Sequence, residues 1–216
     1  MPPVVGLILS YLVGSIPSAF LAGKAKGVDL RTVGSGNLGA TNVFRTLGWK
    51  IGLTVYLADC LKGFLPVALL PGVFGASEIG WRIAFGVAAI AGHVKPIFLL
   101  GKGGGKGVAT ASGVFLALAP MAMLFSMLSF AAVVALSGFV SLGSLVSAVV
   151  LVVAVAVRGT GGMPLLLTVS LVAAFVFWTH RANIERLRNG SEHRFGKRGK
   201  AARADAVQGT STEPAA

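Results

Sequence analysis

Three segments of this chain place small polar and cationic residues directly beside long apolar stretches. They read GSGNLGATNVFR at residues 34–45, GHVKPIFLLGKGGGKGVAT at residues 92–110 and HRANIERLRNGSE at residues 180–192. Glycine lets backbone N–H groups approach an anion closely, and lysine and arginine side chains bind phosphate or carboxylate. Together the three segments predict an anion site at a membrane surface.

In the first segment, neutral hydrogen-bond donors precede an arginine. Ser35, Asn37, Thr41 and Asn42 supply the donors, and Arg45 can form a bidentate pair with phosphate or carboxylate. The glycines also match the pattern G-x-G-x-x-G, but a dinucleotide site requires a preceding strand and a βαβ unit, which this context does not provide. We interpret the segment as an anion-binding loop; a helix-capping turn is the alternative.

The second segment resembles a phosphate-binding loop in its chemistry. Consecutive glycines expose backbone N–H groups, Lys106 adds a positive charge, and a helix predicted to begin near Gly107 would direct its positive end at the same place. It does not match the P-loop pattern, because no Ser or Thr follows the lysine. A phosphate site is favoured over a flexible hairpin.

The third segment begins where an apolar span ends, so His180 is expected at the membrane interface. A histidine with an ordinary pKa near 6.5 can act as a general base or donate a hydrogen bond to phosphate, and Asn183 lies close by in sequence. An interfacial anchor is the simpler reading of the histidine. Arg186, Arg188 and Arg194 are interpreted as lipid-facing charge.

Ionisable residues also occur inside the apolar spans. Asp59 and Lys62 are three positions apart and therefore share a helix face, while His93 lies near the end of the following span. Charged groups at membrane depth are costly, which favours either a mutually neutralising structural pair or a role in supporting the active-site loops.

Composition predicts an integral membrane protein with an all-α fold. Hydrophobic residues make up 55% of the 216 positions, charged residues 12%, and mean hydropathy is +0.82. A span needs about 20 apolar residues. The clearest candidates are residues 3–23, 51–70, 82–100, 140–157 and 163–179, and a further apolar tract covers residues 108–136.

The positions of the basic residues constrain the number of crossings. The segments 24–50, 95–106 and 181–203 hold five, three and eight of the 19 Lys and Arg residues. All three are therefore expected on the cytoplasmic side, so an even number of helices separates the second from the third. Pro120 and Gly138 break residues 107–157 twice, which favours three helices there, a fourth at 163–179 and seven in all; five is the alternative.

No basic residue precedes the first apolar run, which favours an uncleaved first span with its N-terminus outside and a cytoplasmic C-terminus. Residues 1–198 are predicted to form one membrane domain. Residues 199–216 are small and polar and are predicted to be a disordered cytoplasmic tail. The high pI of about 10.8 does not indicate nucleic acid binding, because no aromatic residues are interleaved with the basic ones; positive-inside bias and contact with membrane lipid explain most of the charge.

The three segments resemble the signature motifs of the bacterial acyl-phosphate:glycerol-3-phosphate acyltransferases of the PlsY type, in order and in spacing, across nearly the whole chain before the tail. The resemblance implies transfer of a fatty acyl group from acyl phosphate to the 1-hydroxyl of sn-glycerol 3-phosphate. The products are lysophosphatidic acid and phosphate, in the first step of phospholipid biosynthesis. It also implies seven helices, no cofactor, no metal, and a cytoplasmic-face active site in the bacterial inner membrane.

The resemblance also implies roles for individual residues. The catalytic group is Ser35, Asn37 and His180. The group that binds glycerol 3-phosphate is Arg45, Lys106, His180 and Asn183. The group that binds acyl phosphate is Gly104, Gly105, Lys106, Gly107 and Val108, and the supporting group is Thr41, Asn42, Asp59, Lys62 and His93.

Two positions depart from the family pattern: one extra glycine lies between Pro96 and Lys106, and Thr179 stands where the family commonly has arginine. A membrane transporter of an anionic metabolite is the alternative function, since it would also need glycine-rich polar loops and an intramembrane ion pair. Transporters usually carry internal repeats, and none is evident in this sequence. Oligomeric state is not indicated.

Overall fold

The computed structural model describes residues 2–195. Every regular element in that range is a helix, which confirms the predicted all-α fold. A dinucleotide-binding βαβ unit requires strands, and residues 2–195 form none. The predicted tail at 199–216 and the last residues of the predicted domain at 1–198 lie outside the described residues.

The elements follow one another with short connections, except for the two motif-bearing loops. In chain order they are α1 (Pro3–Gly14), α2 (Ser18–Ala25), α3 (Ala40–Thr46), α4 (Trp49–Phe74), α5 (Ile79–Val94), η1 (Ile97–Leu99, a 3-10 turn), α6 (Val108–Leu118), α7 (Pro120–Ser137), α8 (Val140–Arg158), α9 (Gly162–Thr179) and α10 (Arg181–Arg188).

The three helices predicted for residues 107–157 are confirmed as α6, α7 and α8, and α9 follows them before the third motif. α7 begins at Pro120, where a missing N–H costs nothing, and ends before Gly138, whose φ of 78° closes the helix in a left-handed cap. Six segments in residues 2–195 are long and apolar enough to cross a membrane; α6, with 11 residues, is about 16 Å long and is not among them.

The first span was predicted as one continuous segment, and here the structure differs. α1 ends at Gly14 and α2 starts at Ser18, although the two together still have the length of a span. Pro17 explains the interruption, because a proline has no N–H to continue the ladder and disfavours helical geometry at the residue before it.

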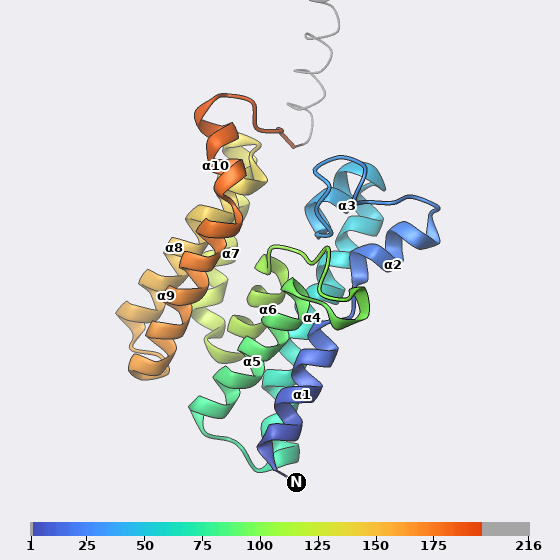
Figure 1. The fold of residues 1–216 in the computed structure, drawn as a ribbon. Coiled ribbons are helices and arrows are strands. Elements are labelled where there is room, and N and C mark those ends of the chain that lie inside the picture. Colours follow the sequence, from blue (N-terminus) through green and yellow to red (C-terminus); the bar gives the residue numbers. More distant parts are fainter. Residues whose placement is uncertain (1, 196–216) are drawn as a thin grey trace, which may run out of the picture.

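The helices form two groups (Figure 1). α1, α4, α5 and α6 pack together, and α7, α8 and α9 form a second set; the groups meet where α6 contacts α7 and α5 contacts α9. In the view of Figure 1, α1, α5, α7 and α9 run upward and α4, α6 and α8 run downward, so the N-terminal end and α10 lie at opposite ends of the molecule.

α6 is held against α4 by close backbone contact. A Cβ at Gly113 would collide with the carbonyl group of Cys60, and a Cβ at Gly63 would collide with the carbonyl group of Thr110. Small residues allow this approach, which is the usual way for membrane helices to gain packing energy. The contact fixes the start of α6 and with it the glycine-rich loop that precedes it.

Buried apolar residues form two clusters beneath the motif-bearing loops. One cluster, spread over α4 to α9, fills the space between the two helix groups, and a second packs α2, α3 and the loop between them onto α4. The outer surface carries exposed large apolar side chains, including Leu69, Val157 and Leu171. This is the distribution expected of a protein that faces lipid.

Candidate active site

The glycine-rich loop between α5 and α6 lies below the upper ends of the neighbouring helices (Figure 1). Gly107, with φ of 84°, caps α6, and the helix begins at Val108 as predicted. The unpaired N–H groups of this first turn and the positive end of the helix dipole therefore adjoin the loop. Irregular backbone at this depth is tolerated where protein surrounds it or where it lines a cavity.

A hydrogen-bond network joins the second motif to the third. The Lys106 Nζ donates to Oδ1 of Asn183, and the Asn183 Nδ2 donates to Oε1 of Glu192 at 2.8 Å. The same carboxylate accepts from Nε of Arg186 at 2.7 Å and from Oγ of Ser141 at 2.9 Å. Glu192 thus aligns the asparagine that holds the lysine.

A tight turn after α10 brings Glu192 to this position. Gly190 adopts a φ of 69°, and the N–H groups of Ser191 and Glu192 donate to the carbonyl of Arg186 at 2.9 and 3.1 Å. The prediction that Arg186 is lipid-facing charge is wrong, because its guanidinium pairs with the carboxylate that the turn returns to it.

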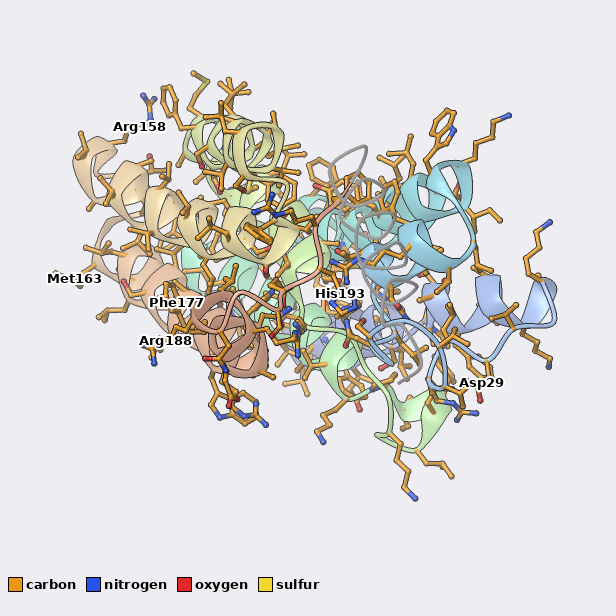
Figure 2. All side chains as sticks on the ribbon, turned by 90° about the horizontal axis from the view of Figure 1, so that it is seen from above. Asp29, Arg158, Met163, Phe177, Arg188 and His193 are labelled. Carbon is orange, nitrogen blue, oxygen red and sulfur yellow. The ribbon has the colours of Figure 1, made fainter. Side chains whose placement is uncertain are left out.

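The segment after this turn connects the two helix groups. The Arg45 Nη2 donates to the carbonyl of His193 at 3.4 Å, and the rings of Phe44 and Phe195 meet edge to face with centroids 5.9 Å apart. Seen from above, His193 lies over the middle of the molecule, whereas Asp29 lies at the outer edge (Figure 2). Arg45 and the third motif therefore belong to one central polar region.

His180 caps the C-terminus of α9 and is only 4% exposed, so it is not a surface anchor. Its Nδ1 lies 2.7 Å from the carbonyl oxygen of Val176. A carbonyl can only accept, so Nδ1 carries the proton and Nε2 of the neutral ring is left as an acceptor. Burial, and next the charge of Lys106, lower the pKa of His180 to about 4, against the opposing effects of the Val176 hydrogen bond and of Glu192.

The charged groups of this network shift one another's pKa values. Burial lowers the pKa of Lys106 to about 8; Glu192 opposes the change, whereas Arg186 and Arg45 reinforce it. Burial alone would raise the pKa of Glu192, but hydrogen bonds from Asn183 and from the two other donors outweigh it and lower the pKa. At neutral pH the region therefore holds a charged lysine, a carboxylate and a neutral histidine.

The loop of the first motif is organised by Asn42, which is 1% exposed. Its Oδ1 accepts the backbone N–H of Ser35 at 2.9 Å, and its Nδ2 donates to two loop carbonyls at 3.0 and 3.1 Å. The Ser35 residue is exposed, Asn37 is half-buried, and Thr41 is half-buried in the first turn of α3. Asn42 therefore shapes the loop that presents the serine.

The predicted shared helix face of Asp59 and Lys62 is confirmed; their Nζ and Oδ1 atoms are 2.7 Å apart, and His93 lies beside the same carboxylate. All three are buried below the glycine-rich loop. Across residues 2–195, His, Cys, Asp and Glu side chains form no group of three that could hold a metal ion.

A family model described as glycerol-3-phosphate acyltransferase matches residues 4–190. The chain belongs to this family. A glycerol-3-phosphate acyltransferase of Geobacter sulfurreducens is 48% identical over 188 residues, covering 87% of this chain and 94% of that protein. Another, of Aquifex aeolicus, is 43% identical over 190 residues, covering 88% and 97%.

Two solved structures share the fold of this acyltransferase. Both are crystal structures of PlsY (YgiH), an integral membrane glycerol 3-phosphate acyltransferase. The glycerol 3-phosphate form matches with a TM-score of 0.84 and 41% identity, covering 90% of this chain and 96% of that chain. The lysophosphatidic acid form matches with a TM-score of 0.82 and 39% identity, covering 90% and 95%. The resemblance predicted from the three motifs is confirmed.

Within the acyltransferase, the fold unites residues that are far apart in sequence. Lys106 and Asn183 are in contact, Arg45 bonds to the segment that carries Glu192, and His180 caps the adjacent helix. The roles of these residues toward substrates stay predictions. Glu192, which lies within the third motif, was not predicted as a site residue.

Replacing Glu192 by alanine is expected to destabilise the acyltransferase by about 2–3 kcal/mol, because three buried or half-buried donors lose their acceptor. The melting temperature in detergent should fall by about 5–10 °C. Glu185→Ala is the matched control, since Glu185 is exposed on α10 and its loss should be nearly neutral. Equal melting temperatures for the two variants would contradict the prediction.

Proposed function

We propose that this protein transfers a fatty acyl group from acyl phosphate to the 1-hydroxyl of sn-glycerol 3-phosphate, forming lysophosphatidic acid and inorganic phosphate. One observation carries the proposal: a largely apolar cavity between the helix groups reaches Val108, the first residue of α6, directly after the glycine-rich loop that carries Lys106. Such a place suits a substrate with a phosphate at one end and an acyl chain at the other.

The cavity supports an acylated donor. It is lined by residues of α6, α7, α8 and α9, most of them apolar with serines among them. Val108, beside the glycine-rich loop, and Val176, one turn from His180, line one end; Phe115, Met123 and Leu151 lie deeper. An acyl chain here would leave its phosphate beside the N–H groups of Gly104, Gly105, Gly107 and Val108 and the ammonium of Lys106.

The polar network supports glycerol 3-phosphate as acceptor. Arg45, Lys106 and Asn183 offer donors to a phosphate dianion, and the Nε2 of His180 can accept a hydrogen bond from a glycerol hydroxyl. The related crystal structures are described as glycerol 3-phosphate and lysophosphatidic acid forms of that enzyme, which supports the same acceptor and product here.

In the reaction, the 1-hydroxyl oxygen attacks the acyl carbonyl carbon, and the bond from that carbon to the bridging phosphate oxygen breaks. The hydroxyl proton passes to a substrate phosphate oxygen, to Nε2 of His180 or to Ser35, and phosphate leaves. Because acyl phosphate is already an activated anhydride, positioning and neutralisation of charge supply most of the rate acceleration. Asn37 would lie with Ser35 at the reacting centre.

We expect direct transfer without an acyl-enzyme. The described contacts give the side chain of Ser35 no histidine or carboxylate partner that could activate it as a nucleophile; its loop is held through backbone bonds to Asn42. Incubation with palmitoyl phosphate alone should leave the intact mass of the protein unchanged. A mass increase of one palmitoyl group would contradict this expectation.

The three basic segments support a cytoplasmic orientation for the site. α2 and α3, which adjoin or lie in the first segment, and α10, in the third, lie at the upper end in Figure 1, and the second segment forms the loop at the upper ends of α5 and α6. Cytoplasmic ends of membrane helices are enriched in Lys and Arg. We infer that this end faces the cytoplasm in a bacterial inner membrane, where soluble glycerol 3-phosphate can reach it.

The test measures lysophosphatidic acid formation and phosphate release by purified protein in detergent, given palmitoyl phosphate with and without glycerol 3-phosphate, or palmitoyl-CoA with glycerol 3-phosphate as the alternative donor. Release that requires glycerol 3-phosphate and palmitoyl phosphate is expected. Turnover with palmitoyl-CoA and none with palmitoyl phosphate would show that the donor is acyl-CoA and contradict the proposal. Absence of turnover from protein of verified fold would favour transport of an anionic metabolite, because only a transporter needs a sealed compartment.

A further inference from the structure

A buried charged cluster formed by Asp59, Lys62 and His93 lies in α4 and α5, outside the residues that would touch substrate. The three residues are only 1%, 5% and 6% exposed. The Nζ of Lys62 is 2.7 Å and the Nδ1 of His93 is 3.7 Å from Oδ1 of Asp59. Ionisable groups at membrane depth are costly, so their presence here indicates a functional role.

The cluster also holds the interruption between α1 and α2. The Nζ of Lys62 donates to the carbonyl of Ile16 at 2.8 Å. That carbonyl belongs to the non-helical stretch before Pro17, where the helical ladder is broken and backbone groups need other partners. Lys62 therefore links α4 to the break in the first span.

On its other side the cluster supports the glycine-rich loop. A Cβ at Gly105 would collide with Nε2 of the His93 ring, so the loop backbone rests directly on that ring. A Cβ at Gly104 would collide with the carbonyl of Val94, the last residue of α5. A small cavity is lined jointly by the cluster, the loop and the α1–α2 break.

We propose that Asp59, Lys62 and His93 are positioning residues that hold the glycine-rich loop in the conformation that binds a substrate phosphate. This inference rests on the proposed function. Consecutive glycines have little conformational preference of their own and need external support to present their N–H groups together. The Asp59 carboxylate lies beside the His93 ring, Lys62 neutralises that carboxylate, and the ring supports Gly105.

The decisive experiment tests the contact between Gly105 and His93. Gly105 has no positive φ, so its backbone accepts alanine, and the atoms nearest to the methyl group of Gly105→Ala are Nε2 and Cε1 of His93, followed by the carbonyl oxygen of Leu38. We expect this variant to raise about tenfold the KM for the substrate whose phosphate the loop holds, with a smaller change in kcat. Adding His93→Ala removes the obstruction and should bring the KM of the double variant below that of Gly105→Ala alone.

Gly103→Ala is the matched control. Gly103 has φ of 74°, and a Cβ there would face Leu38 instead of His93. Its defect should therefore not be relieved by His93→Ala. Additive effects of Gly105→Ala and His93→Ala, or equal relief of both glycine variants, would overturn the proposal.

A second variant removes both charges and avoids leaving one buried alone. Asp59→Asn combined with Lys62→Met should keep the melting temperature within a few degrees of wild type and raise the same KM. A wild-type KM in that variant would show that the ion pair does not position the loop.

Failure of the proposed function is recognised separately, because the wild-type protein would then show no turnover. In that case the protection of each variant by inorganic phosphate against thermal unfolding decides the inference. Protection lost in Gly105→Ala and regained with His93→Ala supports it. Equal protection of wild type and Gly105→Ala overturns it.

Discussion

Replacing Lys106 by alanine should lower kcat/KM for glycerol 3-phosphate about a hundredfold. The lysine is held by Asn183, and through it by Glu192, in a place where burial leaves few competing waters. Removing one partner of such a charge-assisted contact costs about 2–5 kcal/mol, and each 1.4 kcal/mol is a factor of ten. Phosphate-release rates at several concentrations of glycerol 3-phosphate measure the loss.

Lys106→Arg provides the control and a pH dependence. The pKa of Lys106 is lowered to about 8, so the charged fraction falls as the pH rises through that value, and kcat/KM of the wild type should fall with it. An arginine keeps its charge at every pH used, so the fall in kcat/KM of Lys106→Arg should occur at a higher pH, even if the maximal rate of the variant is lower. An unchanged alkaline limb would assign that limb to another group.

The helices could largely be predicted from the sequence because their determinants are local. Pro120 and Gly138 mark both breaks in the long apolar tract, since one lacks an N–H and the other adopts a left-handed cap. The break at Pro17 carries the same signal, but the apolar run around it is long enough for one span, so length alone predicts a continuous helix. The glycine-rich loop lies deep because α6, with 11 residues, is short. The position of α6 is fixed by its packing on α4, a tertiary contact that the sequence does not reveal.

The site could be predicted in part, and its limits follow from tertiary contacts. The motifs identified Lys106 and Asn183, but the contact between them joins a loop to α10, and the helices α6 to α9 separate the two in sequence. Glu185 and Glu192 are both carboxylates among arginines, and only the turn at Gly190 determines that Glu192 is the one that meets Arg186. Helical spacing sufficed for Asp59 and Lys62, whose contact lies within one helix.

Filling the apolar cavity should change the preference for donor chain length. Ala173 lines the cavity from α9, about 10 Å along the helix from His180 by the rise of 1.5 Å per residue. A short acyl chain, as in butanoyl phosphate, would end above Ala173, whereas a hexadecanoyl chain must pass it. Ala173→Phe should therefore lower kcat/KM for hexadecanoyl phosphate about 10–100-fold and leave butanoyl phosphate nearly unaffected.

The expected loss in kcat/KM comes from steric overpacking, which costs about 1–3 kcal/mol. Lost burial contributes little, because a displaced acyl chain would enter lipid or detergent that is equally apolar. Leu171→Phe is the matched control: it adds a ring to the same helix on a side chain that is 71% exposed, outside the cavity. Met123→Ala acts in the opposite direction, since it enlarges the deep end and should favour longer chains. Equal losses for short and long donors in Ala173→Phe would place the acyl chain elsewhere.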